Sequence, residues 1–296
     1  MLPTFKTLFP YNQELIAEYP LMNDAEVQKR IDKASAGFSS WKSKSFAQRA
    51  DILIKVARLM RRDHEKLATL ISREMGKVLS ESRAEIEKCA WVCDYYAEKG
   101  AGFLKDEKRE AGYARSFISY QPIGAVLAIM PWNFPFWQVF RFAAPALMAG
   151  NVGLLKHAPN VCGCSLAIEQ LFQEAGADAG VMSSLIIDVP AVEKIISSGI
   201  VQAVTLTGSE KAGSSVAALA GKHIRKSVLE LGGSDALIVL ADADIKKAAV
   251  TAVQSRMQNA GQSCIAAKRF IVVESAEDTF LQEISAEIKK LKQGNP

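Results

Sequence analysis

Apolar residues recur every three or four positions through the N-terminal part of the chain, which is the spacing of an amphipathic helix. The pattern is strongest in "SFAQRADILIKVARLMRRDHEKLATLISREMGK" and "ESRAEIEKCAWVCDYYAEKG". An Asp that opens "DAEVQKRIDKASAGFSSW" is a candidate N-cap. We therefore predict helices over residues 24–98, followed by an extended ribbon at 113–121, where "YARSFISYQ" alternates in polarity.

From residue 124 onward, short apolar runs alternate with helical patterns. Alternating strands and helices predict βαβ units and a mostly parallel sheet, and strands this apolar are expected to be buried on both faces. The predicted fold class is therefore α/β. The predicted strands cover residues 124–130, 152–156, 184–189, 201–207, 226–231 and 235–240, and the predicted helices between them cover 136–150, 164–175, 191–198 and 208–221.

The chain has 296 residues, of which 49% are hydrophobic and 23% charged, which fits one large or two ordinary globular domains. The net charge of +4 is small and the charges are interspersed, so nothing points to nucleic acid as a partner. We find no signal peptide, and no apolar run approaches the roughly 18 residues of a membrane span. We expect a cytoplasmic protein that does not enter membranes.

The cysteine pattern argues against a disulfide scaffold and indicates a reducing compartment, because the number is odd and the spacing forms no framework. The histidines lie far in sequence from the closely spaced cysteines, so zinc would lack further ligands and we expect no metal site. These cysteines are interpreted as small buried hydrophobes. The cysteines are Cys89, Cys93, Cys162, Cys164 and Cys264.

Polar residues follow the predicted strands at their carboxyl ends, where parallel sheets bind ligands. "PWNFP" follows the strand 124–130, Lys156 ends the strand 152–156, and "TGSEKAG" follows the strand 201–207. Glu230 precedes "GG" at the end of another strand. We therefore predict a ligand site at this edge of the sheet.

Each of these motifs has a functional interpretation. Asn133, fixed between two prolines, could donate an amide N–H to an oxyanion. "TGSEKAG" could hold a phosphate at a helix start, although it is neither G-x-G-x-x-G nor a P-loop. Glu230, among apolar residues, should have a raised pKa suited to a general base. Cys264 in "GQSC" could be a nucleophile at the start of a helix.

Each motif also has a plainer interpretation. Asn133 could be a turn residue, Lys156 a solvated lysine, and "TGSEKAG" a helix cap. Glu230 could be paired with a basic side chain, and Cys264 could be a buried thiol. Taken one at a time, the motifs leave these alternatives open.

Together, "PWNFP", "TGSEKAG", "LELGG" and "NAGQSC", in this order and spacing, resemble the aldehyde dehydrogenase superfamily. The likeness runs over nearly the whole chain, from "TLFPYNQELIAEYP" to "AGQSCIAAKRFIV". "KHAPN" with "LGGSDALIVL" looks most like bacterial succinate-semialdehyde dehydrogenases that use NAD or NADP. The resemblance implies a Rossmann-like cofactor domain (1–112 and 122–232), an oligomerisation ribbon (113–121), and the first part of an α/β catalytic domain (233–296).

The resemblance also implies residue roles. Cys264 would attack the aldehyde, Asn133 and the Cys264 backbone N–H would hold the oxyanion, and Glu230 would activate water to hydrolyse the thioester. Lys156 would bind the adenosine ribose, and Trp132 and Ser209 would lie at the pyrophosphate. Arg141 would pair with a substrate carboxylate. The other positions expected to contact the cofactor are Met130, Gly208 and Leu231.

The sequence departs from the family pattern in three ways. Gln258 stands where some members carry a second carboxylate-binding Arg, which weakens the substrate assignment. Pro159 replaces the Glu of "KPxE", so we predict use of NADP as well as NAD, because no carboxylate would repel a 2′-phosphate. Family chains also continue beyond "IKKLKQGNP", so we expect this chain alone to be poorly stable and nearly inactive, and a full-length form to be a homo-oligomer.

Two other functions compete with an aldehyde-oxidising enzyme. One is a non-catalytic remnant that still binds nucleotide or pairs with other chains. The other is a Cys–Glu hydrolase that uses no nicotinamide, against which "TGSEKAG" and Lys156 argue.

Overall fold

The computed structural model describes residues 3–296. Its helices are α1 (Asp24–Trp41), α2 (Phe46–Arg62), α3 (His64–Met75), α4 (Leu79–Phe103), α5 (Trp137–Met148), α6 (Cys162–Glu174), α7 (Ala191–Ser197), α8 (Glu210–Lys222), α9 (Ile245–Met257) and α10 (Glu274–Lys289), with a short 3-10 helix η1 (Pro159–Val161). Its strands are β1 (Thr4–Leu8), β2 (Leu15–Pro20), β3 (Glu107–Lys108), β4 (Phe117–Ile118), β5 (Ala125–Met130), β6 (Val152–His157), β7 (Met182–Ser184), β8 (Val201–Thr207), β9 (Lys226–Glu230), β10 (Asp235–Val239) and β11 (Ala267–Val272).

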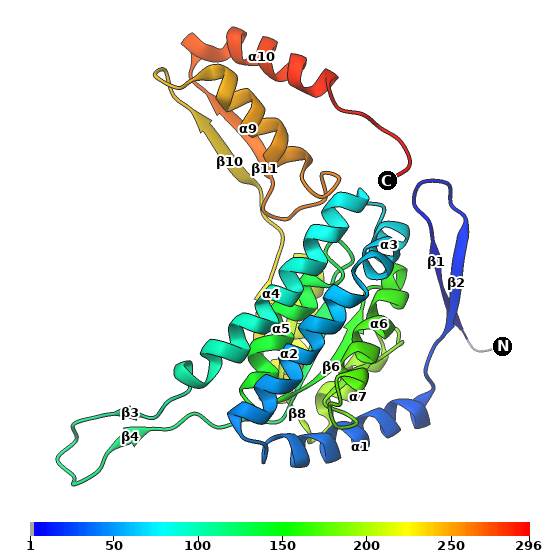
Figure 1. Ribbon diagram of the computed structural model, residues 1–296, viewed down its shortest axis with the longest axis vertical. Helices are drawn as coiled ribbons and strands as arrows, with labels where there is room; N and C mark the ends of the chain where they lie inside the picture. The colour runs from blue at the N-terminus through cyan, green and yellow to red at the C-terminus, as the bar shows by residue number, and fades with distance from the viewer. Residues whose placement is uncertain (1–2) are drawn as a thin grey trace.

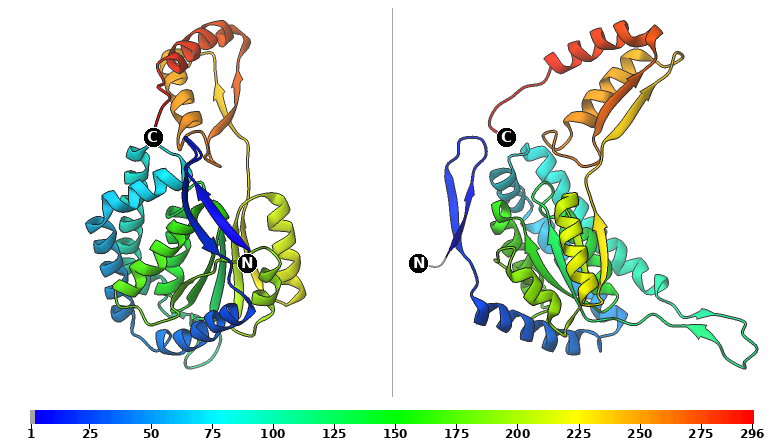
Figure 2. Two further views of the ribbon diagram at one scale, coloured as in Figure 1. Left: turned by 90° about the vertical axis from the view of Figure 1, so that its right-hand side faces the viewer. Right: turned by 180° about the vertical axis from the view of Figure 1, so that it is seen from behind.

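A five-stranded parallel sheet forms the centre of the larger unit, with strand order β7-β6-β5-β8-β9. The connections through α5 and α6 place successive strands on one side of β5, and the connection through α8 places β9 on the other side. Figure 1 shows α2, α4, α5 and α6 in front of this sheet, and the view from behind in Figure 2 shows α8 over its other face. The predicted α/β fold with a parallel sheet is confirmed.

The predicted helices over residues 24–98 are present as α1 to α4. The N-cap of α1 is Asn23 rather than Asp24, because the Asn23 side chain accepts a hydrogen bond from Glu26 N in a capping box. Ser45 and Gln48 form the same capping box at the start of α2. Both caps begin their helices with a residue that satisfies a backbone N–H left free by the first turn.

Burial on both faces holds for β5 and β6, and it fails for the half-buried β8 and for β9 at one edge of the sheet. Every residue of β6 is buried, and β5 is nearly so. The edge strand β9 is mostly exposed, and the Glu230 side chain is 55% exposed. The predicted apolar surroundings of Glu230 are therefore wrong, because β9 is largely uncovered in this structure.

Three further segments differ from the sequence-based expectations. The strand predicted at 184–189 is the earlier and shorter β7, and residues 185–187 are buried without strand pairing. The extended segment at 113–121 pairs only through β4, whose partner β3 lies earlier in the chain, and Figure 1 shows this hairpin projecting from the body. The antiparallel hairpin of β1 and β2 was not predicted, since its residues mix polarity without clear alternation.

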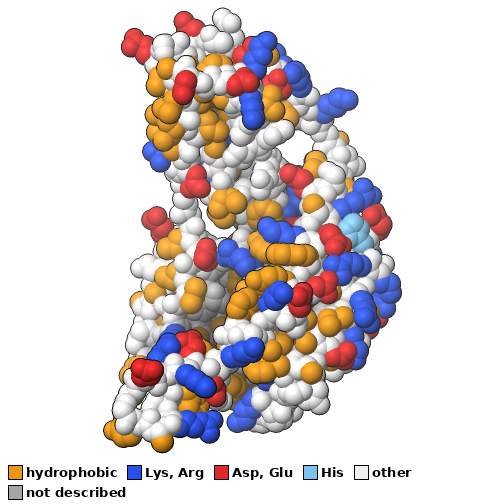
Figure 3. Space-filling model, turned by 60° about the vertical axis from the view of Figure 1, so that its left-hand side comes forward, with side chains coloured by type: hydrophobic (Ala, Val, Ile, Leu, Met, Phe, Trp, Pro, Cys, Tyr) orange, Lys and Arg blue, Asp and Glu red, His pale blue; other side chains and the backbone are white. Residues whose placement is uncertain are grey.

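The C-terminal residues form a smaller unit with its own core. β10 and β11 pair in parallel, and α9 and α10 pack together beside them. Its core has six buried residues, Val239, Ala249, Ala252, Val253, Phe280 and Ile284. Figure 1 shows this unit above the larger one, and Figure 3 shows hydrophobic side chains gathered on its surface.

Candidate active site

The carboxyl ends of β5 and β8 meet where the strand order reverses, which is where open α/β sheets bind ligands. The loops that follow these strands bound a cavity of about 350 Å³. The segment that contains Cys264 closes this cavity from the smaller unit. The lining residues are Pro131, Trp132, Asn133, Thr207, Gly208, Ser209, Leu231, Gly232, Gly233, Gly261, Gln262, Ser263, Cys264 and Lys268.

The start of α8 has the features of an anion site within this cavity. Ser209 is the N-cap, and its hydroxyl accepts a hydrogen bond from Ala212 N at 3.2 Å. Gly213 allows close packing, because a Cβ there would lie 2.6 Å from Leu231 Cδ2. The remaining free N–H groups of the first turn suit a phosphate.

Lys156 is buried, so the plainer interpretation of a solvated lysine is wrong. The residue is 8% exposed, and its Nζ lies 3.4 Å from the carbonyl oxygen of His157. Burial lowers its pKa, and it makes no ion pair within residues 3–296. A buried cation without a carboxylate partner is suited to a ligand that brings hydroxyl or phosphate oxygens.

Asn133 and the Cys264 segment are joined by direct hydrogen bonds. Asn133 Nδ2 donates to Gln262 O at 2.8 Å. In return, Asn259 Nδ2 donates to Asn133 O at 2.8 Å. The structure therefore places the predicted oxyanion donor against the turn that carries the predicted nucleophile.

Cys264 lies in a turn between α9 and β11, so the expected helix after it is wrong. Lys268 Nζ donates to Cys264 O at 2.7 Å. Cys264 is half-buried, whereas the other cysteines are buried. Burial raises the pKa of those thiols, for example that of Cys162 to about 12. Cys264 is therefore the cysteine that solvent and ligands can reach.

A second cavity, of about 290 Å³, reaches Cys264 from the side of α4 and α5. Arg141 and Lys88 bring positive charge to its wall, and Lys88 Nζ lies 3.9 Å from the centroid of the Trp137 ring. Gln258 also lines it, at the position where the family comparison led us to look for a second Arg. This cavity can receive a short chain with a carboxylate at its far end.

Glu230 and Met130 lie apart from Cys264, in a third cavity of about 520 Å³. Glu230 Oε2 is 3.7 Å from Arg141 Nη2, so the plainer interpretation of a basic partner holds in this structure. Arg141 lines both this cavity and the one that contains Cys264. The structure thus gathers Asn133, Cys264, Trp132, Gly208, Ser209 and Leu231, and does not gather Glu230, Met130 and Lys156 with them.

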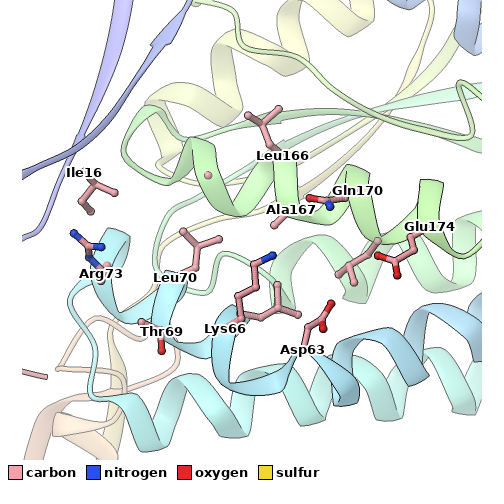
Figure 4. A pocket seen from close by; sticks show the side chains of 13 residues that line it. Ile16, Asp63, Lys66, Thr69, Leu70, Arg73, Leu166, Ala167, Gln170 and Glu174 are labelled. Atoms are coloured by element: carbon pink, nitrogen blue, oxygen red, sulfur yellow. The ribbon is translucent and has the colours of Figure 1, made fainter.

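A separate cavity of about 410 Å³ lies between α3 and α6 and is shown in Figure 4. Its labelled charged side chains, Asp63, Lys66, Arg73 and Glu174, come from these helices and their starts. None of the predicted site residues lines it.

Several residues of the site were missed by sequence reasoning. Glu81 accepts from Asn259 N at 2.7 Å, and Lys88 lines the cavity beside Cys264. Both stand on helix α4, far from the catalytic motifs in sequence. A lysine and glutamates on one helical pattern look like a solvated face, so only the fold could reveal them.

Neither a metal site nor a membrane helix is present in the described part of the chain. Residues 3–296 contain no group of three or more His, Cys, Asp or Glu side chains placed to hold a metal ion. In the same residues, each helix is too short or too polar to span a bilayer.

Comparison with known proteins gives a consistent result. The sequence profile of the aldehyde dehydrogenase family matches residues 2–296. A probable NADP(+) succinate-semialdehyde dehydrogenase from Synechocystis is 48% identical over 290 residues, which cover 98% of this chain and 64% of that protein. The NAD(P)+ succinate semialdehyde dehydrogenase Sad of Escherichia coli K12 is 44% identical, over 97% of this chain and 62% of that protein.

Solved structures agree with these sequence matches. The structure of Gox0499, which was solved to explain its selection of cofactor and substrate, superposes with a TM-score of 0.97 at 41% identity. The match covers 100% of this chain and 65% of that one. The succinic semialdehyde dehydrogenase of Streptococcus pyogenes with NADP+ has a TM-score of 0.96 at 36% identity, covering 99% of this chain and 64% of that one. The chain therefore spans less than two thirds of the length of these relatives.

Proposed function

The chain belongs to the aldehyde dehydrogenase family, and from this premise we propose that it oxidises a short carboxylated aldehyde, such as succinate semialdehyde, through Cys264. The observation that carries the proposal is the reciprocal bonding of Asn133 and the Cys264 turn on the wall of one cavity. That cavity also contains the start of α8 at the reversal of strand order.

The Cys264 thiolate would attack the aldehyde carbon and form a thiohemiacetal, with negative charge on the former carbonyl oxygen. An amide has two N–H bonds, and the one that Asn133 gives to Gln262 fixes the side chain, so that the other can face the oxyanion. The Cys264 backbone N–H would be the second donor. After oxidation, Glu230 would activate water against the thioester once its exposed side chain turns away from Arg141.

The cofactor proposed is NADP or NAD, and the relatives named for NADP(+) or NAD(P)+ use support this choice. The residues present fit a dinucleotide. The α8 start, with Gly208 and Ser209, suits its phosphates, and the buried Lys156 suits ribose or 2′-phosphate oxygens. Pro159 brings no carboxylate that would repel a 2′-phosphate. When bound, the nicotinamide would accept the hydride from the substrate carbon.

The charge of the second cavity supports a carboxylated substrate. Lys88 makes no ion pair within the described residues, and Arg141 has only the 3.7 Å contact with Glu230. A guanidinium can hold a carboxylate with two hydrogen bonds, and Lys88 would add a second cation where Gln258 supplies none. The two side chains together would favour an aldehyde with a distal negative charge over a neutral one.

The test mixes wild-type protein, with NADP or NAD bound, with succinate semialdehyde or butanal. Stopped-flow absorbance then follows formation of the reduced cofactor. We expect slow NADPH and NADH formation that the Cys264→Ala variant lacks, at a rate far below that of a full-length homologue, because this chain alone is expected to be nearly inactive. Cofactor binding by calorimetry without reduction by any aldehyde would support the non-catalytic alternative and refute the proposal. Strict use of NAD would refute the dual cofactor assignment.

The carboxylate specificity has its own test. Arg141→Met and Lys88→Met should each raise KM for succinate semialdehyde by roughly tenfold, the value of one charge-assisted contact, with little change for butanal. Lys99→Met, on the same helix α4 but outside the cavity, is the matched control. Equal changes in KM for both aldehydes would show that Arg141 and Lys88 do not recognise the carboxylate.

Self-association is a further part of the proposal. The hairpin of β3 and β4 exposes aromatic and aliphatic side chains, including Tyr113 at 82%, Phe117 at 43% and Ile118 at 43%. Exposed apolar patches of this kind mark association surfaces. Analytical ultracentrifugation of a full-length form should show a homo-oligomer that Phe117→Ser with Ile118→Ser dissociates, and a monomer without these substitutions would contradict this.

A further inference from the structure

The first turns of α4 touch both loops that build the site. Glu81 and Glu85 stand one helical turn apart and therefore point to the same side of the helix. Glu81 Oε1 accepts from Asn259 N at 2.7 Å, in the turn that carries Cys264. Glu85 Oε1 accepts from Phe136 N at 2.8 Å and Trp137 N at 2.9 Å, next to the loop that carries Asn133. Figure 1 shows the start of α4 directly below the end of α9.

The Glu85 contacts form a buried anchor. Its second carboxylate oxygen accepts a hydrogen bond from Lys77, whose side chain is entirely buried. Lys77 Nζ also lies 4.3 Å from the centroid of the Phe134 ring. A carboxylate at the start of α5 is stabilised by the helix dipole as well as by Lys77. The segment after Asn133 is therefore fixed to α4.

The Cys264 turn is strained and depends on outside contacts. Asn259, Ala260 and Gly261 have φ values of 59°, 53° and 72° in succession. Non-glycine residues adopt the left-handed region at a cost, so two of them in a row persist only where neighbouring contacts hold them. The contacts from the larger unit are the bond from Asn259 N to Glu81, the bond from Asn259 Nδ2 to Asn133 O and the bond from Asn133 Nδ2 to Gln262 O. Within the smaller unit, Arg256 Nη1 donates to Gly261 O at 2.9 Å.

We propose that Glu81 is a positioning residue that holds the Cys264 turn in register with Asn133. The inference rests on the proposed function, because it concerns how the thiol and the oxyanion donor act on one carbonyl group. Glu81 is half-buried and forms no ion pair within residues 3–296, so its role differs from that of the buried Lys77–Glu85 pair. Through Asn259 it links α4 to both loops at once.

The consequence concerns reactions at Cys264 that need an oxyanion donor. In acylation by 4-nitrophenyl acetate, the thiolate forms a bond to the acetyl carbon and the carbonyl electron pair moves to oxygen. The pair then returns as 4-nitrophenolate leaves, which gives acetyl-Cys264. Alkylation by iodoacetamide forms a sulfur–carbon bond and releases iodide, with no oxyanion. Neither reaction uses a nicotinamide cofactor.

The test compares the rates of the two reactions at Cys264 by peptide mass spectrometry, in wild type and variants. Glu81→Ala should slow acylation about tenfold, since a small misplacement of a donor costs that much or more, and should change alkylation less than about twofold. Glu81→Gln should retain nearly wild-type rates, because its amide oxygen can still accept from Asn259 N. Glu87→Ala, on the exposed side of α4 where Glu87 pairs with Arg61, is the matched control.

Three results would overturn the proposal: an equal fall in both reactions, an unchanged acylation rate in Glu81→Ala, or a Glu81→Gln variant as slow as Glu81→Ala. Should Glu81→Ala fail to fold by circular dichroism, Glu81→Met keeps the side-chain volume without the acceptor and decides the matter on the same criteria. A wild-type protein that acylates no faster than free cysteine would instead refute the proposed function itself.

Discussion

The five-stranded sheet buries its strands β5 and β6 on both faces, whereas the two-stranded sheet of β10 and β11 leaves Ile238 and Ile271 64% and 48% exposed. The larger unit packs its helices against a continuous core, and the smaller unit has six buried core residues. Cys264 belongs to the thinly packed unit, and Asn133 belongs to the densely packed one. The reactive group therefore depends for its position on the contacts that cross between the units.

This difference separates two kinds of contribution. The larger unit supplies rigid parts, which are the α8 start, the loop after β5 and the anchor on α4. The smaller unit supplies a turn in an unfavourable backbone conformation. Loss of packing in the smaller unit should abolish the reactions of Cys264 while nucleotide binding survives. Loss of packing in the larger unit should weaken both.

The largest effect is expected from Phe280→Ala in the smaller core. Deleting this buried ring should cost about 3–5 kcal/mol, which a core of six residues cannot absorb. Acylation of Cys264 should fall by more than about a hundredfold, while calorimetry should give a nucleotide affinity within a few fold of wild type. Phe140→Ala, in the larger core, is the counterpart and should weaken both activities. If Phe280→Ala acylated Cys264 at the wild-type rate, the proposed difference between the two units would be contradicted.

The pH dependence of stability should come from the larger unit. Burial lowers the pKa of His157 to about 4, and its neutral ring is satisfied by contacts to Pro135 O and Ala158 N. Because the unfolded chain binds the proton near pH 6.5, stability is full above that pH and is lost as pH falls toward 4. The loss should be roughly 3 kcal/mol.

Urea unfolding at pH 7 and pH 4.5, in wild type and His157→Gln, measures this effect. The difference between the two proteins isolates His157 from Glu74, whose pKa is raised by burial and whose contribution has the opposite sign. The variant should lose less stability on acidification than wild type. An equal loss of stability in wild type and His157→Gln would show that the pH dependence comes from groups other than His157.

Lys156→Met should separate binding from stability within the larger unit. Removal of a buried cation that makes no ion pair in the described residues should leave the free energy of unfolding unchanged or raise it by up to about 1 kcal/mol. Nucleotide affinity should fall roughly tenfold or more, because a charged hydrogen-bond donor is lost. Thermal unfolding and calorimetry check the two effects, and destabilisation without loss of affinity would contradict the assignment.

The smallest effects should come from matched helix caps. Ser45 accepts from Gln48 N at 3.2 Å in the larger unit, and Asp244 accepts from Lys247 N at 3.1 Å in the smaller one. Replacement of either by Ala should cost about 1 kcal/mol. Amide exchange should report the Asp244→Ala loss in the smaller unit alone, since that unit can open by itself. Exchange that rises across the whole chain would show that the two units unfold together.

Much of the fold was predictable because each signal was local. Apolar periodicity identified the helices before residue 98 and the buried strands β5 and β6, and the order of strands and helices predicted the parallel sheet. The same rule overestimated the burial of β9, because a strand's sequence does not reveal that it lies at an edge. The hairpin of β1 and β2 was missed because its residues mix polarity without clear alternation.

The site was predictable only in part. Strand ends and motifs led to Asn133, Ser209 and Cys264, which the structure brings to one cavity, although their catalytic roles stay predictions. Glu230 illustrates the limit, since its motif says nothing about the contact with Arg141. Glu81 could not be found from sequence, because its role depends on a hydrogen bond across two units.

The most direct test of the central claim, that Asn133 and Cys264 act as one acylation site, is the ratio of acylation to alkylation at Cys264 in Asn133→Ala. Loss of an oxyanion donor costs about a hundredfold or more in rate. The account predicts that acylation by 4-nitrophenyl acetate falls by this factor while alkylation by iodoacetamide changes less than about threefold. An unchanged ratio would contradict the account, because Cys264 would then react without the donor that the larger unit supplies.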